Sequence, residues 1–237
     1  MTKEMILTCL GDHPWAENLI VLDMVDSTNN YLKTHFDLPH GTVVIADCQT
    51  AGRGRLGRTF VSPKGQGLYL SVLLHQKPEL RLTPMAAEAV RRGVLLETGI
   101  AAQIKWVNDL QCGGKKLCGI LTEAAADHVI LGIGLNCRGT PHEAAVSLET
   151  LGCPVDRSRL AAQVIYQLSS MSEQWMEDYR KHCCTIGQEI AIHQNGTVRR
   201  GHADDVDDMG ALLVTLPDGQ KERIFSGEVT IRQEVIL

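Results

Sequence analysis

Residues 50–67 read T-A-G-R-G-R-L-G-R-T-F-V-S-P-K-G-Q-G and hold five glycines and three arginines. Glycine reaches backbone conformations that are closed to other residues and lets the main chain approach a ligand closely. Arginine presents a planar, permanently charged fork that suits phosphate and carboxylate groups. The alternation of the two residues therefore predicts a cationic, donor-rich loop that folds over a polyanion and neutralises charge there.

Two apolar runs flank this loop, residues 42–46 and 68–74, and each predicts a buried strand. A solvated surface loop and an RNA-binding arginine–glycine segment are the alternative interpretations of the loop taken alone. Both are less favoured, because binding loops are usually carried between rigid elements. The loop is therefore expected to be a ligand-binding connection between two strands.

The bulk composition fits a globular protein of 237 residues, long enough for a medium domain and a small one. A hydrophobic content of 44% is sufficient for a core, and a net charge of −5 argues against a general nucleic-acid binder. No apolar run is long enough to span a membrane, and the N-terminal one is too short and interrupted for a signal peptide. A cytoplasmic location is the expectation.

The eight cysteines form no C-x-x-C pair and match no zinc-site spacing. Two of them are adjacent, which disfavours a disulfide between them. All eight are predicted to be reduced thiols, mostly small core residues, and a catalytic cysteine is the less favoured alternative. They are Cys9, Cys48, Cys112, Cys118, Cys137, Cys153, Cys183 and Cys184.

The first three quarters of the chain alternate between strands and helices. Strands are predicted over residues 19–25, 42–46, 68–74, 101–107, 116–124 and 128–135, with a Gly-Gly hairpin turn before the fifth. One helix is expected after a cap at Asp26 or Ser27. A second opens at Thr83-Pro84 and stops at Gly99, and its apolar face makes it scaffold. A third is capped by Asp156 and runs to about Lys181.

The sequence pattern changes after Cys184, from long strands and helices to short strands separated by turns. Residues 189–193 alternate, Asn195-Gly196 is a strong two-residue hairpin signal, and further strands are predicted over residues 211–216 and 228–232. Short strands with turns at this spacing predict a small β-barrel. The chain is therefore divided into a domain of residues 1–184 and a C-terminal domain of residues 185–237.

Polar residues gather at the predicted strand tips and in the glycine-rich connections. No Ser/His/Asp signature is present, so charge neutralisation by Arg and Lys is favoured over attack by a protein nucleophile. Asn108 and Asp109 offer oxygen ligands for Mg²⁺. Glycines within a strand, here Gly132 and Gly134, often mark the close approach of a ligand or another backbone. These features predict a site for an anionic, nucleotide-like ligand.

Five motifs in the range 26–136 together resemble those of biotin–protein ligases. They are S-T-N at residues 27–29, G-R-G-R-L-G-R at 52–58, K-W-V-N-D at 105–109, K-x-x-G-I-L-x-E at 116–123 and G-x-G-x-N at 132–136. The C-terminal strands resemble the SH3-like domain of the same family more loosely. The resemblance implies an α+β fold: a mixed sheet flanked by helices, similar to the catalytic domain of class II aminoacyl-tRNA synthetases, followed by a small SH3-like β-barrel.

The resemblance also implies a two-step reaction. The biotin carboxylate attacks the α-phosphate of ATP with Mg²⁺ present, and pyrophosphate leaves; a lysine of a biotin carboxyl carrier protein then attacks the biotinyl-5'-AMP. The implied catalytic residues are Lys116, Arg55 and Arg53. The implied biotin-binding residues are Ser27, Thr28, Asn29, Gln49, Arg53, Gly54, Arg55, Lys116, Gly119, Gly132 and Gly134. The implied ATP or adenylate residues are Arg53, Arg55, Arg58, Phe60, Lys105, Asn108, Lys116 and Asn136.

The chain departs from the family pattern in three places. Val107 stands where the family usually has proline, which puts the stiffness of that turn in doubt. Phe60 stands where tryptophan is frequent and would stack less strongly on adenine. The stretch before S-T-N is too short for a helix-turn-helix domain, so no DNA-binding role is expected. A homodimer is left open.

Three other functions compete with this hypothesis. A lipoate–protein ligase or related acyltransferase shares the catalytic fold, but the arginine loop together with K-W-V-N-D favours biotin. A non-catalytic biotin or adenylate sensor is less favoured, because Lys116 and all three loop arginines are present. RNA binding is opposed by the acidic net charge and by the aromatic content of 4%.

Overall fold

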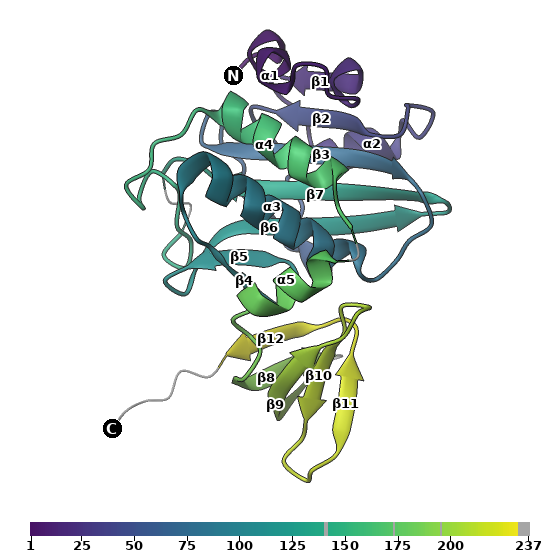
Figure 1. The fold of residues 1–237 in the computed structure, drawn as a ribbon, viewed down its shortest axis with the longest axis vertical. Coiled ribbons are helices and arrows are strands. Elements are labelled where there is room, and N and C mark those ends of the chain that lie inside the picture. Colours follow the sequence, from purple (N-terminus) through teal and green to yellow (C-terminus); the bar gives the residue numbers. More distant parts are fainter. Residues whose placement is uncertain (140–141, 173, 195, 232–237) are drawn as a thin grey trace.

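The computed structural model describes residues 1–139, 142–172, 174–194 and 196–231. The chain forms a seven-stranded sheet and a five-stranded sheet. Helices α3 (Leu82–Thr98) and α4 (Arg157–Ser169) lie across one face of the large sheet, and the small sheet lies at one end of the molecule (Figure 1). The predicted mixed sheet flanked by helices is confirmed.

The large sheet has the strand order β1-β2-β3-β7-β6-β5-β4. Its strands are β1 (Leu19–Leu22), β2 (Thr42–Ala46), β3 (Gly67–His75), β4 (Gln103–Lys105), β5 (Asp109–Cys112), β6 (Lys115–Ala125) and β7 (His128–Asn136). Only β1 and β2 are parallel, and each other neighbouring pair is antiparallel. The three longest strands, β3, β7 and β6, occupy the three central positions of the sheet.

The central strands are buried on both faces, which explains why β3 is apolar along nearly its whole length. The short helix α2 (Thr28–Lys33) packs on the face opposite to α3 and α4, against β2, β3 and β7. Helix α1 (Lys3–Leu10) packs against α4, and the 3-10 turn Ala16–Asn18 leads into β1. The α2 face is thinly covered, so it is the face with room for a ligand.

Strand β4, which follows α3, covers only Gln103–Lys105 and is shorter than the strand predicted over residues 101–107. The chain turns at Asn108, whose backbone oxygen accepts from the Ile120 amide at 2.8 Å while its Nδ2 donates to the Ile120 carbonyl at 2.9 Å. Asp109 consequently opens β5 instead of following a strand. The two hydrogen bonds fix this turn although Val107 replaces the proline of the family.

Three helix predictions need correction. The helix predicted over residues 156–181, which includes residue 173 outside the described residues, is two helices, α4 and α5 (Trp175–His182). The Ser170 hydroxyl donates to the carbonyls of Tyr166 and Gln167, a side-chain bond that competes with helix continuation. Pro84 is the third residue of α3, not the first. Ser27 occupies the N-cap of α2, but its side chain makes no capping bond.

The small sheet has the strand order β11-β10-β9-β8-β12, and each neighbouring pair is antiparallel. Its strands are β8 (Glu189–Gln194), β9 (Thr197–Val206), β10 (Leu212–Thr215), β11 (Lys221–Ile224) and β12 (Glu228–Ile231). Within the described residues β11 and β12 do not pair, so no closed barrel is seen. Asn195 of the predicted turn and Arg232 of the last predicted strand lie outside the described residues.

The cysteine prediction holds only in part. All eight cysteines are free thiols, but only three, Cys118, Cys137 and Cys183, are buried, and Cys9 is exposed. Burial raises the pKa of the Cys118 and Cys137 thiols, which keeps them protonated. No helix within the described residues is long and apolar enough to cross a membrane.

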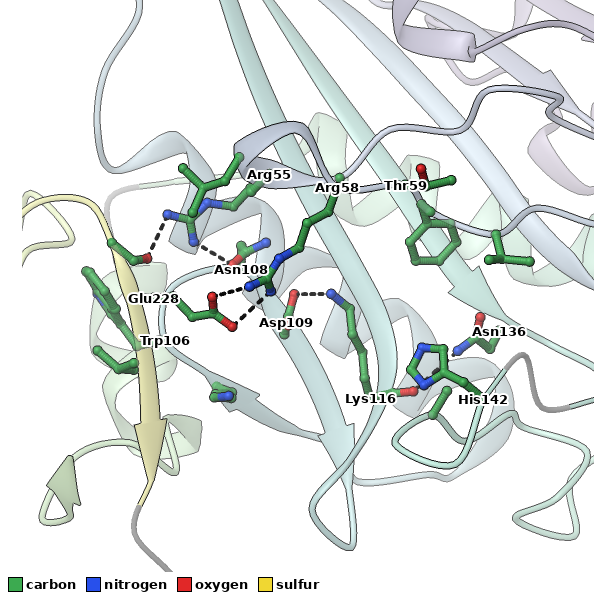
Figure 2. A pocket seen from close by; sticks show the side chains of 18 residues that line it. Arg55, Arg58, Thr59, Trp106, Asn108, Asp109, Lys116, Asn136, His142 and Glu228 are labelled. Atoms are coloured by element: carbon green, nitrogen blue, oxygen red, sulfur yellow. Dashed lines mark hydrogen bonds and ion pairs between the residues drawn. The ribbon is translucent and has the colours of Figure 1, made fainter. Parts of the chain in front are cut away.

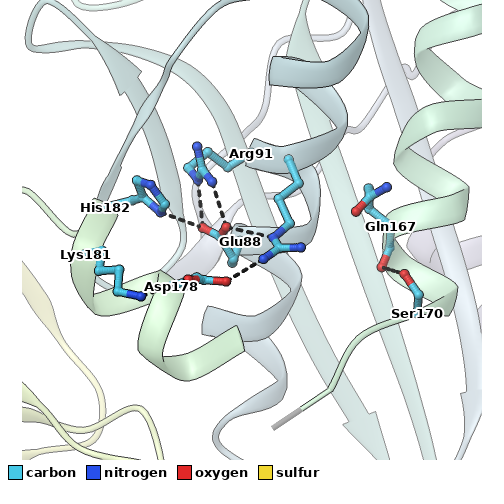
Figure 3. Close-up of polar contacts among 8 residues, drawn as sticks. Glu88, Arg91, Gln167, Ser170, Asp178, Lys181 and His182 are labelled. Carbon is cyan, nitrogen blue, oxygen red and sulfur yellow. Dashed lines mark hydrogen bonds and ion pairs between the residues drawn. The ribbon is translucent and has the colours of Figure 1, made fainter. Parts of the chain in front are cut away.

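Helix α3 carries a buried ion cluster that joins it to α5, as Figure 3 shows. Glu88 is fully buried and accepts from Nε and Nη2 of Arg91, each at 2.7 Å. Arg92 donates to Glu88 at 3.1 Å and also pairs with Asp178 of α5. Nδ1 of His182 lies 3.4 Å from the Glu88 carboxylate. The sequence predicts α3 to be scaffold, and its polar residues hold it against α5.

Replacement of Glu88 by alanine is expected to lower the free energy of unfolding by about 3–5 kcal/mol, because it leaves Arg91 buried without its partner. Chemical denaturation monitored by circular dichroism measures the change. The matched control is Glu177→Ala, which breaks the exposed pair with Lys181 on the same side of the molecule and should cost at most about 0.5 kcal/mol. Equal losses for the two variants would contradict the role of the buried cluster.

Candidate functional site

Two adjoining cavities lie under the arginine loop. The outer cavity, of about 290 Å³, lies between the loop, β5, β6 and β12 (Figure 2). The inner slot, of about 40 Å³, runs beneath the loop toward α2. Both are lined by Gly54, Arg55, Phe60, Asn108 and Lys116, which therefore mark the junction between the two cavities.

The structure brings the predicted residues together in two groups. The inner slot is lined by every residue expected to bind biotin: Ser27, Thr28, Asn29, Gln49, Arg53, Gly54, Arg55, Lys116, Gly119, Gly132 and Gly134. The outer cavity is lined by Arg55, Arg58, Phe60, Lys105, Asn108, Lys116 and Asn136 of the residues expected to bind ATP. Arg53, which belongs to both predicted groups, lines the slot and not the outer cavity.

Glycines in β7 allow side chains to lie directly on the sheet. A Cβ on Gly132 would lie 2.2 Å from Oδ1 of Asn29, and a Cβ on Gly134 would lie 2.5 Å from the Phe60 ring. At both distances the neighbouring side chain would have to move to admit a Cβ. Glycine at these two positions therefore lets α2 and the arginine loop rest against the sheet, and the Phe60 ring forms part of the wall between the slot and the outer cavity.

A hydrogen-bonded network fixes the polar wall of the slot. The amide and hydroxyl of Thr28 both donate to Oε1 of Gln49, at 2.9 and 3.1 Å. The fully buried Ser71 hydroxyl lies 2.7 Å from Oγ1 of Thr28 and 2.5 Å from Oδ1 of Asn29. Sequence analysis missed Ser71, although a lone serine inside the apolar run 68–74 was a usable signal.

Glu123 on β6 gathers three donors at the edge of the slot. Its carboxylate accepts from Nζ of Lys33 at 2.7 Å, from Nδ2 of Asn29 at 2.9 Å and from Nη2 of Arg53 at 3.2 Å. Burial raises the pKa of Glu123, but the hydrogen bonds from Lys33 and Asn29 outweigh burial and hold the pKa below its ordinary value. Glu123 lies in the quoted K-x-x-G-I-L-x-E motif, but no role was predicted for it.

Arg55 connects three parts of the chain. Its Nη1 donates to Oδ1 of Asn108 at 2.8 Å, and its Nη2 donates to the carbonyl of Gly227 in the C-terminal segment at 3.0 Å. Burial lowers the pKa of the guanidinium, while Asp109 and Glu228 act in the opposite direction. The group stays charged, because an arginine pKa starts far above neutrality. A cation in this partly desolvated place interacts strongly with any anion that enters.

The C-terminal sheet contributes an acidic wall to the outer cavity. Both oxygens of Glu228 accept from Arg58, at 2.9 and 2.5 Å. The hydrogen bond from Arg58 is the main cause that lowers the pKa of Glu228, and burial opposes it. Sequence analysis missed Gly227 and Glu228, because no local pattern shows that a strand about 170 residues away returns to the loop.

Lys116 lies at the junction of the two cavities, and its Nζ is 2.7 Å from Oδ1 of Asp109. Asn136 donates from Nδ2 to the carbonyls of Lys116 and Val146, at 3.3 and 3.2 Å. These two bonds fix the Asn136 side chain at the cavity wall, beside His142 (Figure 2). His142 was not predicted, and no motif in the sequence marks it.

The cavity offers limited protein ligation for a metal ion. Within residues 1–139, 142–172, 174–194 and 196–231, no group of three or more His, Cys, Asp or Glu is arranged to hold one. Asp109 and Glu228 are the carboxylates that line the outer cavity, and Oδ1 of Asn108 is engaged by Arg55. This set suits an ion that is held largely by ligand phosphates with one carboxylate added, as Mg²⁺ frequently is.

The site therefore consists of two adjoining cavities with the cations Arg55 and Lys116 at their junction. Residues 21–136 match the Biotin/lipoate A/B protein ligase family, and residues 185–232 match the Biotin protein ligase C terminal domain. The chain belongs to the biotin–protein ligases of this family.

Individual relatives agree with this assignment. The Bifunctional ligase/repressor BirA of Bacillus subtilis is 35% identical over 91% of this chain and 74% of its own length. The Biotin–[acetyl-CoA-carboxylase] ligase of Mycobacterium tuberculosis is 33% identical over 80% of this chain and 78% of its own. A structure of the biotin protein ligase from Aquifex aeolicus in complex with biotin and ATP superposes with a TM-score of 0.80 and 31% identity, covering 92% of this chain and all of that one.

Replacement of Gly134 by alanine is expected to lower the free energy of unfolding by about 1–3 kcal/mol, because the new methyl group collides with the Phe60 ring. Thermal or chemical denaturation measures the loss. The control is the double variant with Phe60→Leu, in which the smaller side chain relieves the collision. If Gly134→Ala costs as much in the Phe60→Leu background as in the wild type, the clash is not its cause.

Replacement of Glu228 by glutamine is expected to loosen the attachment of the arginine loop to the C-terminal sheet, because it removes the ion pair with Arg58 and leaves the Arg55–Gly227 bond. Hydrogen–deuterium exchange of residues 53–60 should be faster than in the wild type at pH 7. Since the folded-state pKa of Glu228 is lowered, its pairing with Arg58 is present above the ordinary glutamate pKa. The pairing is lost as the pH falls through the lowered folded-state value.

Exchange protection of the wild-type loop, corrected for intrinsic rates, should therefore fall to that of the variant in acid. The matched control is Glu222→Gln, which removes the partner of Arg199 within the small sheet and should leave the loop unchanged. Unchanged protection in Glu228→Gln would show that the pairing does not hold the loop.

Proposed function

We propose that the protein is an ATP-dependent biotin–protein ligase, which forms biotinyl-5'-AMP and transfers biotin to a lysine of a biotin carboxyl carrier protein. The observation that carries the proposal is the pair of cavities that meet at Arg55 and Lys116. The narrow slot combines uncharged polar side chains with the cations Arg53, Arg55 and Lys116, which suits an uncharged ring system with a carboxylate tail. The wider cavity has several cations on its walls and suits a nucleoside triphosphate.

In the first step, biotin lies in the slot and its carboxylate reaches the junction. A carboxylate oxygen attacks the α-phosphorus of ATP, the bond to the bridging oxygen breaks, and pyrophosphate leaves with its electron pair. Two anions approach each other in this step, so their repulsion is a large part of the barrier. Lys116 and Arg55 lie where positive charge offsets that repulsion and stabilises the transition state more than the separate ligands.

Within this proposal, the network of Thr28, Gln49, Ser71 and Asn29 gives the slot a fixed set of polar partners. Phe60 separates the ring of biotin from the base of the nucleotide, and Asn136 faces the base end of the cavity. Arg58 and Lys105 add charge near the phosphates. Asp109, with Asn108 beside it, would hold Mg²⁺ against the phosphates, and this ion supplies further charge neutralisation.

In the second step, the neutral amine of the carrier lysine attacks the carbonyl carbon of the mixed anhydride. The amide bond forms as the nitrogen loses one proton to solvent, the bond from the carbonyl carbon to the phosphate oxygen breaks, and AMP leaves with that electron pair. The same cations stabilise the charge that develops on the departing phosphate. The carrier is a domain of a biotin-dependent carboxylase.

Further proposals concern the organisation of the protein. We assign residues 1–184 to the catalytic domain, resembling class II aminoacyl-tRNA synthetases, and residues 185–237 to an SH3-like domain, supported by the change from the large sheet to the small one. Within the described residues, Thr122 and Ala124 of β6 pair with β7 on one side and with no strand on the other, and this strand edge supports a homodimer. The eight free thiols support a cytoplasmic location. DNA binding is not part of the proposal.

A second candidate is a lipoate–protein ligase, since the matched family includes such enzymes by name. The hydrogen-bonded polar network of the slot favours biotin, whose ureido ring carries donors and acceptors, over the apolar dithiolane ring of lipoate. A non-catalytic sensor would need no cation at the junction, and Lys116 is present there.

Pyrophosphate exchange into ATP tests the proposal, with biotin and lipoate added in parallel. Biotin-dependent exchange is expected, and both Lys116→Ala and Arg55→Ala should lower its rate by about 10²–10³-fold, because each removes charge stabilisation at the junction. The control is Arg159→Ala, which removes an exposed arginine on α4 away from the site and should keep the wild-type rate.

The other outcomes are distinct. Exchange with lipoate alone would move the protein to lipoate ligation. Tight biotin binding without exchange would favour the sensor. A near wild-type rate in Lys116→Ala or Arg55→Ala, with an unchanged melting temperature, would contradict the assigned chemistry.

A further inference from the structure

Arg53 is the cation of the loop that is held away from the outer cavity. Its guanidinium donates to Glu123 at 3.2 Å and to Oδ1 of Asn30 at 3.2 Å, and 45% of the side chain is exposed. Both partners lie on rigid elements, Glu123 on β6 and Asn30 on α2. Arg53 nevertheless lines the slot, so it can exchange its protein partners for a ligand anion.

A second cation, Lys33, also pairs with Glu123, and it does not line the slot. Nζ of Lys33 lies 2.7 Å from Oε1, the same oxygen that Arg53 contacts. Asn29 and Lys33 are four residues apart on α2 and reach the carboxylate from the same helix face. Two like charges therefore share one carboxylate oxygen, and each weakens the attraction of the other.

The net charge of the cluster of Arg53, Glu123 and Lys33 depends on whether Arg53 is bound to it. With Arg53 in place, Glu123 and the two cations carry a net charge of about +1. When Arg53 leaves, Lys33 and Glu123 remain as a neutral pair, and Asn29 still donates to the carboxylate. Without Lys33, the departure of Arg53 would leave the Glu123 carboxylate, which is only 17% exposed, without any cation.

We infer that Glu123 and Lys33 are positioning residues for Arg53: Glu123 holds the arginine in the ligand-free chain, and Lys33 weakens that hold and keeps Glu123 neutralised when Arg53 moves to the ligand. This inference rests on the proposed function and on the expectation, taken from the family resemblance, that Arg53 contacts biotin or its adenylate. The strength of the Arg53–Glu123 pair then determines what fraction of the free protein is ready to bind.

The test replaces Lys33 by methionine, which keeps much of the side-chain volume and removes the charge. The dissociation constant of biotin is measured by calorimetry and the rate of exchange by pyrophosphate incorporation at saturating biotin. Lys33→Met is expected to weaken biotin binding by about three- to tenfold while the saturated exchange rate stays unchanged, because Arg53 has already left Glu123 in both the biotin-bound state and the transition state. Lys33→Arg should restore the wild-type affinity.

A second background separates this mechanism from a general structural role. In Glu123→Gln there is no carboxylate to hold Arg53, so adding Lys33→Met should change the biotin affinity by less than about twofold. Lys181→Met, which removes an exposed lysine of α5, controls for the change in net charge and should leave biotin affinity unchanged.

The results can overturn the inference without touching the proposed function. A loss of affinity from Lys33→Met that is the same in the wild type and in the Glu123→Gln background would show that Lys33 does not act through the carboxylate. Wild-type biotin affinity in Lys33→Met would also overturn the inference. If the wild-type protein itself shows no biotin-dependent exchange, it is the proposed function that fails.

Discussion

The two hydrogen bonds of Arg55 are the interaction on which the rest of the site depends. They tie the arginine loop to the turn at Asn108 and to the C-terminal segment at Gly227, so one guanidinium connects the large sheet, the loop and the small sheet. A partly buried guanidinium requires acceptors, and these two oxygens supply them. The loop is thereby held in place although its glycines would allow many conformations. The small sheet becomes part of the cavity wall for the same reason.

Three cations of the site are paired with carboxylates before any ligand enters. Arg53 pairs with Glu123, Arg58 with Glu228 and Lys116 with Asp109. A ligand must therefore compete with a carboxylate for each of these three cations, which a neutral molecule cannot do and a triphosphate can. Such pairing also lowers the self-repulsion of a loop with three arginines on a short stretch. This pairing lowers the affinity of the site for anions in general, and it makes the site more selective for highly charged ligands.

The residues of the site that lie in short motifs could be predicted from the sequence. The loop, the strands around it and the residues of the slot are local patterns, and residues 27–29, 52–58 and 132–136 do converge. The missed contributions come from residues whose neighbours are distant in sequence. Ser71, Glu123 and Glu228 act through partners that lie about 40 to 170 residues away. The break between α4 and α5 was missed because serine hydroxyls end a helix without interrupting its apolar pattern.

Stability and binding are divided between the two faces of the large sheet. The face under α3 and α4 carries the packed core and the buried cluster of Glu88 and Arg91. The α2 face carries glycines at Gly132 and Gly134, positions where a larger side chain would add core but fill the slot. A sheet with such gaps on one side loses packing there, since each missing side chain forfeits buried apolar surface. The dense opposite face compensates for that loss, and this is why an open, glycine-floored site can exist on a sheet that remains rigid.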